Sequence, residues 1–144
     1  MSALHDASQS ASDGARRFGY NRNHAWGHKF ACAARGIVRA VRSQSSFVIH
    51  LATAAGVVVA AKVLGADWVE WCILVICIAM VLAAELFNTA IEHLARAITF
   101  DDNPELRDAL DTSSSAVLVM ALGAAVVGVI VLGCRFGITM GWRS

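Results

Sequence analysis

The chain has 144 residues, of which 57% are hydrophobic and only 16% are charged, and its mean hydropathy is +0.58. This apolar excess is larger than that of an ordinary soluble domain and favours the membrane class. The net charge is +1, but seven of the twelve Lys and Arg residues precede the first long apolar run. Positive charge beside a membrane segment explains this asymmetry more economically than nucleic-acid binding does.

The amino-terminal part of the chain is predicted to contain a tail and a surface helix. Residues 1–24 are rich in Ser, Ala, Asn, Asp and Gly without sustained periodicity, which predicts a disordered tail. Residues 25–45 carry apolar side chains at helical spacing, and four basic residues lie among them: Lys29, Arg35, Arg39 and Arg42. A basic amphipathic helix next to a membrane span is expected to lie in the plane of the interface.

Three apolar runs follow, and each is long enough to cross a bilayer core of roughly 30 Å. They cover residues 47–64, 68–94 and 112–132. Ala, Gly and Ser recur in the third run, which favours close packing between helices. Residues 25–144 are therefore predicted to form one all-α integral membrane domain, with a surface helix and three transmembrane helices.

The charge distribution also predicts an orientation. A basic amino-terminal flank favours a cytoplasmic amino terminus, so three crossings place the carboxyl terminus outside and the polar stretch 99–111 inside. The expected location is the inner (cytoplasmic) membrane. Counting back from that stretch at ~1.5 Å per residue places Glu92 at the cytoplasmic interface and Glu85 about two turns deeper. Asp111 is expected to open the third helix at the same level.

Glu85, Asn88 and Glu92 project from one face of the second predicted span. Ionisable groups at membrane depth are costly and usually face a bundle interior, a partner or a ligand. Together with Asp111 they form an oxygen-rich set that suits Mg²⁺, which proteins hold through one or two carboxylates plus substrate phosphates. Such a site could bind ATP through its metal, with the deeper Glu85 placed to take a proton from a lipid hydroxyl.

Other interpretations remain open at this level. Glu85 and Asn88 could simply form hydrogen bonds across helices and specify packing. A proton- or cation-coupled transport subunit could use the same carboxylates as a relay. The chain has no GxxxxGK[ST] loop, so a nucleotide site must be built without one. His50 lies alone in an apolar stretch, where a packing role is the commoner one. The Ser113-Ser114-Ser115 run is expected to bond back to its own helix, with phosphate contact as the minority alternative.

The stretch Glu85-Leu-Phe-Asn88-Thr-Ala-Ile-Glu92 closely resembles the E-x-x-N-[ST]-A-I-E signature of the prokaryotic integral-membrane diacylglycerol kinase family, which includes undecaprenol kinases. Asp111, followed by a Ser-rich segment and Ala116-Val117, partly resembles the second signature of that family, K-D-x-x-[AS]-[AGS]-A-V. The resemblance covers roughly residues 26–133. The layout of one surface helix, three spans and a polar loop is also similar.

The resemblance implies a homotrimer with cytoplasmic active sites between subunits, Mg²⁺-ATP as phosphoryl donor and a lipid alcohol as acceptor. The acceptor would be diacylglycerol, giving phosphatidic acid, or undecaprenol, giving undecaprenyl phosphate. By position, Glu85 would be the catalytic base and Glu92, with Glu85, a metal ligand. Asn88 and Asp111 would bind the nucleotide or form the supporting hydrogen-bond network. The amino-acid sequence around Asn88 resembles the undecaprenol kinase branch more than the diacylglycerol kinase branch.

Two positions depart from the family pattern. Leu110 stands where a lysine is expected, so a phosphate-neutralising cation is missing, and Arg107, about one turn earlier, is a candidate replacement. Gln44 stands where an acidic residue is expected, which leaves the metal shell one carboxylate short. His50 lies where the undecaprenol branch carries His. Gln44, His50 and Ser114 are therefore assigned supporting roles, and an inactive homologue is a further alternative.

Overall fold

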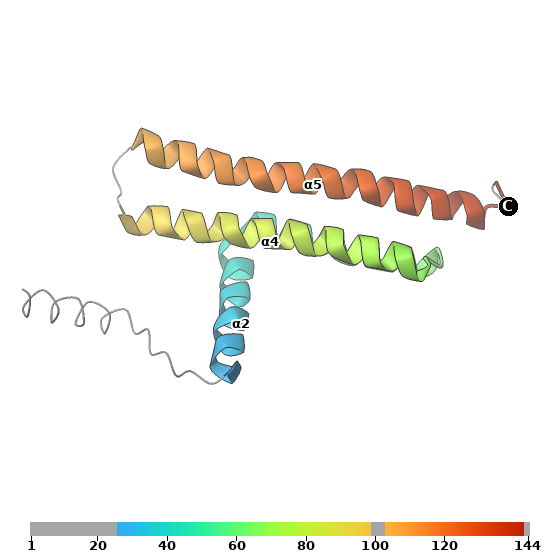
Figure 1. The fold of residues 1–144 in the computed structure, drawn as a ribbon, viewed down its shortest axis with the longest axis horizontal. Helices are drawn as coiled ribbons and strands as arrows, with labels where there is room; N and C mark the ends of the chain where they lie inside the picture. Colours follow the sequence, from blue (N-terminus) through green and yellow to red (C-terminus); the bar gives the residue numbers. More distant parts are fainter. Residues whose placement is uncertain (1–25, 99–102, 143–144) are drawn as a thin grey trace, which may run out of the picture. The chain divides into compact units, whose positions relative to one another are not determined.

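The structure is a computed structural model of the chain, and it describes residues 26–98 and 103–142. The described residues form four α-helices joined by short connections (Figure 1). The chain divides into two compact units, Met1–Gly36 and Ile37–Ser144, and all the contacts discussed below between helices lie within the second unit. The tail predicted over residues 1–24 falls outside the described residues.

Helix α2 is Trp26–Ser43, and the Nζ atom of Lys29 lies 4.8 Å from the centre of the Trp26 ring. Gln44 follows with φ −128° and ψ 117°, an extended conformation that interrupts the helical backbone. The surface helix predicted over residues 25–45 therefore ends at Ser43. Because of this break, α3 starts as a separate helix and Gln44 occupies its N-cap position.

The three remaining helices are α3 (Ser45–Val63), α4 (Trp68–Ile98) and α5 (Pro104–Thr139). Each is long and apolar enough to cross a membrane, as expected for the three spans predicted from the sequence. Most of their large apolar side chains are exposed, including Val129, which is 74% exposed. Such surface is unfavourable in water, whereas lipid tails or neighbouring helices accept it without that penalty.

Helix α5 begins about two turns before the predicted third span, because local signals favour an earlier start. The Asn103 side chain accepts hydrogen bonds from the backbone N–H groups of Glu105 (3.0 Å) and Leu106 (3.4 Å). Pro104 occupies the first turn, where its missing N–H is not needed. The predictions of a polar loop up to residue 111 and of Asp111 at the helix start are therefore wrong.

The connection between α3 and α4 is fixed by hydrogen bonds and an ion pair. Gly65 has φ +69°, a left-handed conformation that glycine adopts without strain. Asp67 and Glu70 cap α4 reciprocally: the Glu70 N–H donates to Asp67 (3.0 Å) and the Asp67 N–H donates to Glu70 (2.8 Å). Arg135 of α5 donates to both carboxylates, with 2.6 Å to Asp67 Oδ2. This ion-pair cluster ties the α3–α4 connection to α5.

Helices α4 and α5 run antiparallel and lie side by side (Figure 1), while α3 packs mainly against α4. Apolar residues buried along these contacts include Leu74 and Val81 of α4 and Val117 of α5. Gly128 of α5 is also buried. Besides the ion-pair cluster, the packing encloses buried polar side chains between the helices, and these include part of the predicted site.

Candidate functional site

Buried polar side chains gather where α4 meets the start of α3 and the first half of α5. Among the described residues, the buried polar or charged side chains are Glu85, Asn88, Thr89 and Ser113. Three of them lie on α4, and Ser113 faces them from α5. Each has a hydrogen-bond partner, because no buried side-chain N or O atom of the described residues is left without one. The cluster is therefore a satisfied polar network inside an otherwise apolar bundle.

Glu85 is the most buried large side chain of the cluster, with only 2% of its surface exposed. The Ser46 hydroxyl, in the first turn of α3, donates a hydrogen bond to Glu85 Oε1. One turn further along α4, the Thr89 hydroxyl donates to the Glu85 backbone carbonyl at 2.9 Å. A carboxylate so far removed from solvent needs such a donor, because burying a charge without a partner is strongly unfavourable.

Asn88 connects Glu92 of its own helix, α4, to the serines of α5. Its Nδ2 donates to Glu92 Oε1 at 2.9 Å, while its Oδ1 accepts from the Ser113 hydroxyl at 2.7 Å. Ser114 Oγ lies 3.4 Å from the same oxygen. Both serine hydroxyls also lie close to the Leu110 carbonyl, at 2.9 Å and 3.0 Å, so the predicted back-bonding is present together with a contact across helices. The amide therefore has a defined orientation.

Glu92 is the outer carboxylate of the cluster, with 24% of its side chain exposed. Gln44, at the N-cap of α3, donates to Glu92 Oε2 through Nε2, and Arg96 pairs with the same oxygen at 3.1 Å. The Gln44 side chain makes no capping bond to its own helix, since it reaches α4 instead. Glu92 thus accepts hydrogen bonds on both oxygens while remaining open to solvent.

The structure brings together five of the predicted site residues: Glu85, Asn88, Glu92, Gln44 and Ser114. It does not bring Asp111 to them. Asp111 is exposed on α5, and its carboxylate makes no hydrogen bond or ion pair with another described residue. The reason is helical phase: Asp111 lies two positions before Ser113, so it projects about 200° away from the face that contacts α4.

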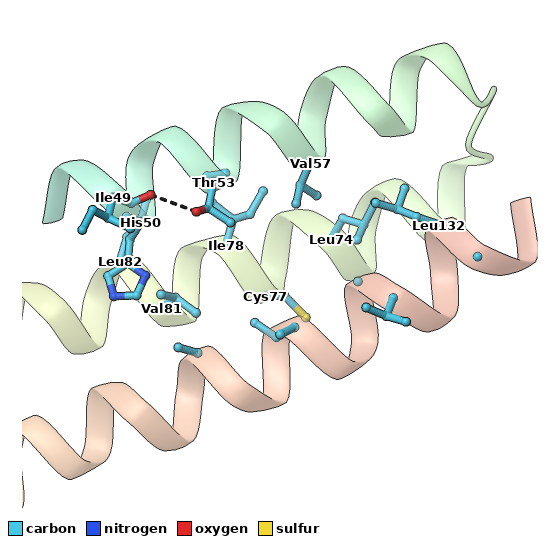
Figure 2. Close-up of a pocket in the computed structure, with 17 residues that line it drawn as sticks. Ile49, His50, Thr53, Val57, Leu74, Cys77, Ile78, Val81, Leu82 and Leu132 are labelled. Carbon is cyan, nitrogen blue, oxygen red and sulfur yellow. Dashed lines mark hydrogen bonds between the residues drawn. The ribbon is translucent and has the colours of Figure 1, made fainter. Parts of the chain in front are cut away.

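Arg107 and His50 also lie away from the carboxylate cluster. Arg107 is exposed one turn before Asp111, on the same side of α5. His50 lies on α3, one turn after Ser46, and its ring points into an apolar groove beside Val81 and Leu82 (Figure 2). The described partners of Glu92 are Gln44, Asn88 and Arg96, so the nucleotide-binding role of Arg107 and the supporting role of His50 remain predictions.

The groove has a volume of about 610 Å³ and is lined by α3, α4 and α5. Figure 2 shows Thr53 and Val57 of α3 and Leu74 and Cys77 of α4 among the residues that line it. Thr53 bonds back to the Ile49 carbonyl at 2.9 Å, which satisfies its hydroxyl. The lining is consequently almost wholly apolar, and the groove begins one helical turn from the Ser46–Glu85 pair.

Two contacts escaped the sequence analysis. Ser46 was not singled out, because a serine in a first helical turn gives no sign of a partner on another helix. The cluster of Arg135, Asp67 and Glu70 was also missed, although the Asp67-to-Glu70 spacing is a capping signal that could have been read. The Glu70 N–H donates to Asp67 and, with Arg135 nearby, holds the pKa of the Asp67 carboxyl below its usual range.

The oxygen-bearing side chains of the cluster can also be compared with the needs of a divalent cation. Within residues 26–98 and 103–142, no group of three or more His, Cys, Asp or Glu side chains is arranged to hold a metal. A carboxylate has about four acceptor positions, so Glu92 can bind a cation and keep its hydrogen bonds. Mg²⁺ usually takes only one or two carboxylates plus substrate phosphates. Glu92 and the neighbouring Asn88 carry oxygens of the kind that Mg²⁺ prefers.

Three apolar helices around a buried carboxylate and amide network define an all-helical membrane protein with a polar site between its spans. Comparison with known proteins identifies the family. The family described as "Prokaryotic diacylglycerol kinase" matches residues 31–132, which include every element of the polar cluster. The chain therefore belongs to the prokaryotic diacylglycerol kinase family and is a lipid kinase.

Two relatives support this assignment. An undecaprenol kinase of Bacillus subtilis (strain 168) is 32% identical over 102 residues, which cover 71% of this chain and 83% of the relative. A diacylglycerol kinase of Synechocystis sp. is 32% identical over 100 residues, which cover 69% of this chain and 57% of the relative. No solved structure matches the chain.

Proposed function

We propose that this kinase transfers the γ-phosphate of ATP to the hydroxyl of a membrane lipid alcohol, either undecaprenol or diacylglycerol. One observation carries the proposal: the family signature places a carboxylate, Glu85, that is 2% exposed between apolar helices yet held by a hydroxyl donor. A packing role alone does not require a carboxylate there, because apolar residues of similar volume are often at least as stabilising. The comparisons favour this function over a transport subunit.

Glu85 acts as the general base in this proposal. A base must lie within hydrogen-bond reach of the proton that it accepts, so the lipid hydroxyl must enter between the helices. The apolar groove that begins one turn from Ser46 offers a path for the hydrocarbon chain. A lipid lying there would bring its hydroxyl to the Glu85 end and keep its tail between α3, α4 and α5.

Glu92 and Asn88 form the nucleotide side of the proposed site. Phosphoryl transfer depends mainly on positioning and on electrostatic stabilisation of the phosphate oxygens. When bound, Mg²⁺ supplies positive charge to those oxygens. Asn88 holds Glu92 in place through its amide, and Gln44 does so from the start of α3. Arg96, paired with Glu92 at the solvent side, adds a cation next to the proposed phosphate position.

Asp111 and Arg107 fit this proposal only from a second copy of the chain or with a nucleotide that extends across α5. Both are exposed on the side of α5 away from Ser113. A homotrimer with sites between subunits would let this side complete the site of a neighbouring copy. The large exposed apolar area of α4 and α5 supports an assembly or a lipid contact there. Arg107 would then supply the positive charge of the lysine that the family pattern has at the position of Leu110.

The membrane placement completes the proposal. Basic residues of α2 recur beside apolar ones such as Trp26, Phe30 and Ile37, which are all exposed. We propose that α2 lies at the cytoplasmic surface of the inner membrane as an amphipathic helix. The amino terminus and the Glu92 end of the polar cluster then face the cytoplasm, where ATP is available.

The proposal is tested by phosphate transfer from labelled ATP in mixed micelles. Undecaprenol and diacylglycerol are compared as acceptors, each with Mg²⁺ and with excess chelator. The expected result is a labelled lipid product that forms with one acceptor more than with the other and only with Mg²⁺. Equal labelling with and without Mg²⁺, or no labelling of either lipid by folded protein, contradicts the proposal.

A further inference from the structure

The start of α3 supplies the side chains that hold both α4 carboxylates. Ser46 donates to Glu85, and Gln44 donates to Glu92. Ser46 lies outside both family signatures. It is exposed while its partner is buried, so it reaches inward from the edge of the cluster.

The Ser46 hydroxyl bonds only across helices among the described residues, whereas the Ser113 and Ser114 hydroxyls approach both Asn88 Oδ1 and the Leu110 carbonyl of their own helix. Thr53, Thr89, Ser115 and Thr139 each donate to a backbone carbonyl four residues earlier on the same helix, at 2.8–2.9 Å. This is the ordinary local bond of a helical Ser or Thr. Ser46 lies in the first turn of α3, directly after the break at Gln44, and its hydroxyl is directed across to α4 instead.

The bond determines which carboxylate oxygen can meet the substrate. Ser46 donates to Glu85 Oε1, and none of the described residues donates to Glu85 Oε2. Every fully enclosed side-chain oxygen of the described residues has a partner, so Oε2 is not fully enclosed. A hydrogen bond between a hydroxyl and a carboxylate is charge-assisted and directional, so it restricts rotation of the carboxylate.

We infer that Ser46 is the positioning residue for Glu85, fixing Oε1 so that Oε2 receives the proton of the lipid hydroxyl. This inference rests on the proposed kinase function and adds a residue to it. Ser46 itself does not contact the transferred phosphate. It acts through the geometry of Glu85, and small errors in such geometry reduce the rate of a proton transfer strongly.

The test compares Ser46→Ala with Ser46→Thr in the lipid phosphorylation assay. Ser46→Ala is expected to lower kcat about 10- to 100-fold and to leave KM for ATP within about 2-fold, since the nucleotide side is not altered. Ser46→Thr keeps the hydroxyl and is expected to retain kcat within about 3-fold. Ser45→Ala is the matched control, because Ser45 is the exposed neighbour in the same turn.

A double variant separates positioning from a merely structural role. Adding Ser46→Ala to Glu85→Gln is expected to cause no further loss, because both changes disable the same step. If Ser46→Ala fails to fold, Ser46→Cys, which keeps the size but donates weakly, is expected to show the same fall in kcat. If kcat is unchanged in the folded Ser46→Ala or Ser46→Cys variant, and Glu85→Gln still abolishes transfer, the inference about Ser46 is wrong and the proposed function stands. Full activity of Glu85→Gln instead overturns the proposed function.

Discussion

Asn88→Asp is the substitution that tests the polar network most sharply, because it changes one atom type and almost no volume. The Asn88 Nδ2 donates to Glu92 Oε1 at 2.9 Å, and the substitution replaces this donor by an oxygen. The Ser113 hydroxyl still donates to the other oxygen, so the side chain keeps its orientation. Two carboxylate oxygens then face each other across the former hydrogen bond.

The size of the effect follows from that distance. Two unit charges 2.9 Å apart repel by about 6 kcal/mol at an effective dielectric constant of about 20. Rotation of the partly exposed Glu92 relieves part of this repulsion, but the charge-assisted hydrogen bond, worth about 1.5–3 kcal/mol, is lost in any case. We expect a loss of about 2–4 kcal/mol in unfolding free energy, which lowers Tm by roughly 6–15 °C for a chain of this size.

The assay is thermal unfolding in detergent, followed by lipid phosphorylation at a temperature where the variant is folded. Asn103→Asp is the matched control, since Asn103 caps α5 and Asp caps a helix about as well as Asn. The control is expected to unfold with the parent protein. If Asn88→Asp shifts Tm no more than Asn103→Asp does, the amide is not a donor to Glu92 and the network is wrong.

Three further predictions concern the ends of the bundle. Arg135→Met should lower Tm in detergent, because Glu70 and Asp67 lose their charged partner; an unchanged Tm would contradict this role of the cluster. The pKa of Asp67 is held low by the Glu70 N–H and by Arg135, so its stabilising contribution is complete above the ordinary value of about 4 and is lost as the pH falls below it. Asp67→Asn should therefore flatten the stability–pH profile below about pH 4, and an identical profile would contradict the assignment. Gln44→Glu should lower Tm without Mg²⁺, through repulsion with Glu92, and recover it with Mg²⁺; insensitivity to Mg²⁺ would argue against a cation there.

The spans and the carboxylate face could be predicted because each rests on local periodicity. Long apolar runs give membrane-spanning helices, and the spacing of Glu85, Asn88 and Glu92 places them on one helix face whatever packs against it. The structure adds which residues of other helices form hydrogen bonds with these three side chains. Ser46 meets Glu85 across a sequence separation of 39 residues, and no local pattern encodes that pairing.

The start of α5 shows how a local error propagates. Polar composition over residues 99–111 was interpreted as a loop, although Asn103 and Pro104 form a recognisable helix start. With the start at Pro104, Asp111 lies inside α5 and not at its beginning. The contact between Ser113 and Asn88 fixes which face of α5 packs against α4. Asp111 then projects to the other side, away from the carboxylates with which it was grouped.

The central claim is that Glu85 accepts the proton of the lipid hydroxyl, and Glu85→Gln measures it most directly. The change keeps size and hydrogen-bonding capacity but removes the base, and the phosphate transfer rate is compared with that of Glu105→Gln, an exposed control of the same chemistry. We expect kcat to fall about 10²–10⁴-fold in Glu85→Gln and to stay within about 2-fold of the parent in the control. A folded Glu85→Gln variant that phosphorylates the lipid at the parental rate would contradict the account.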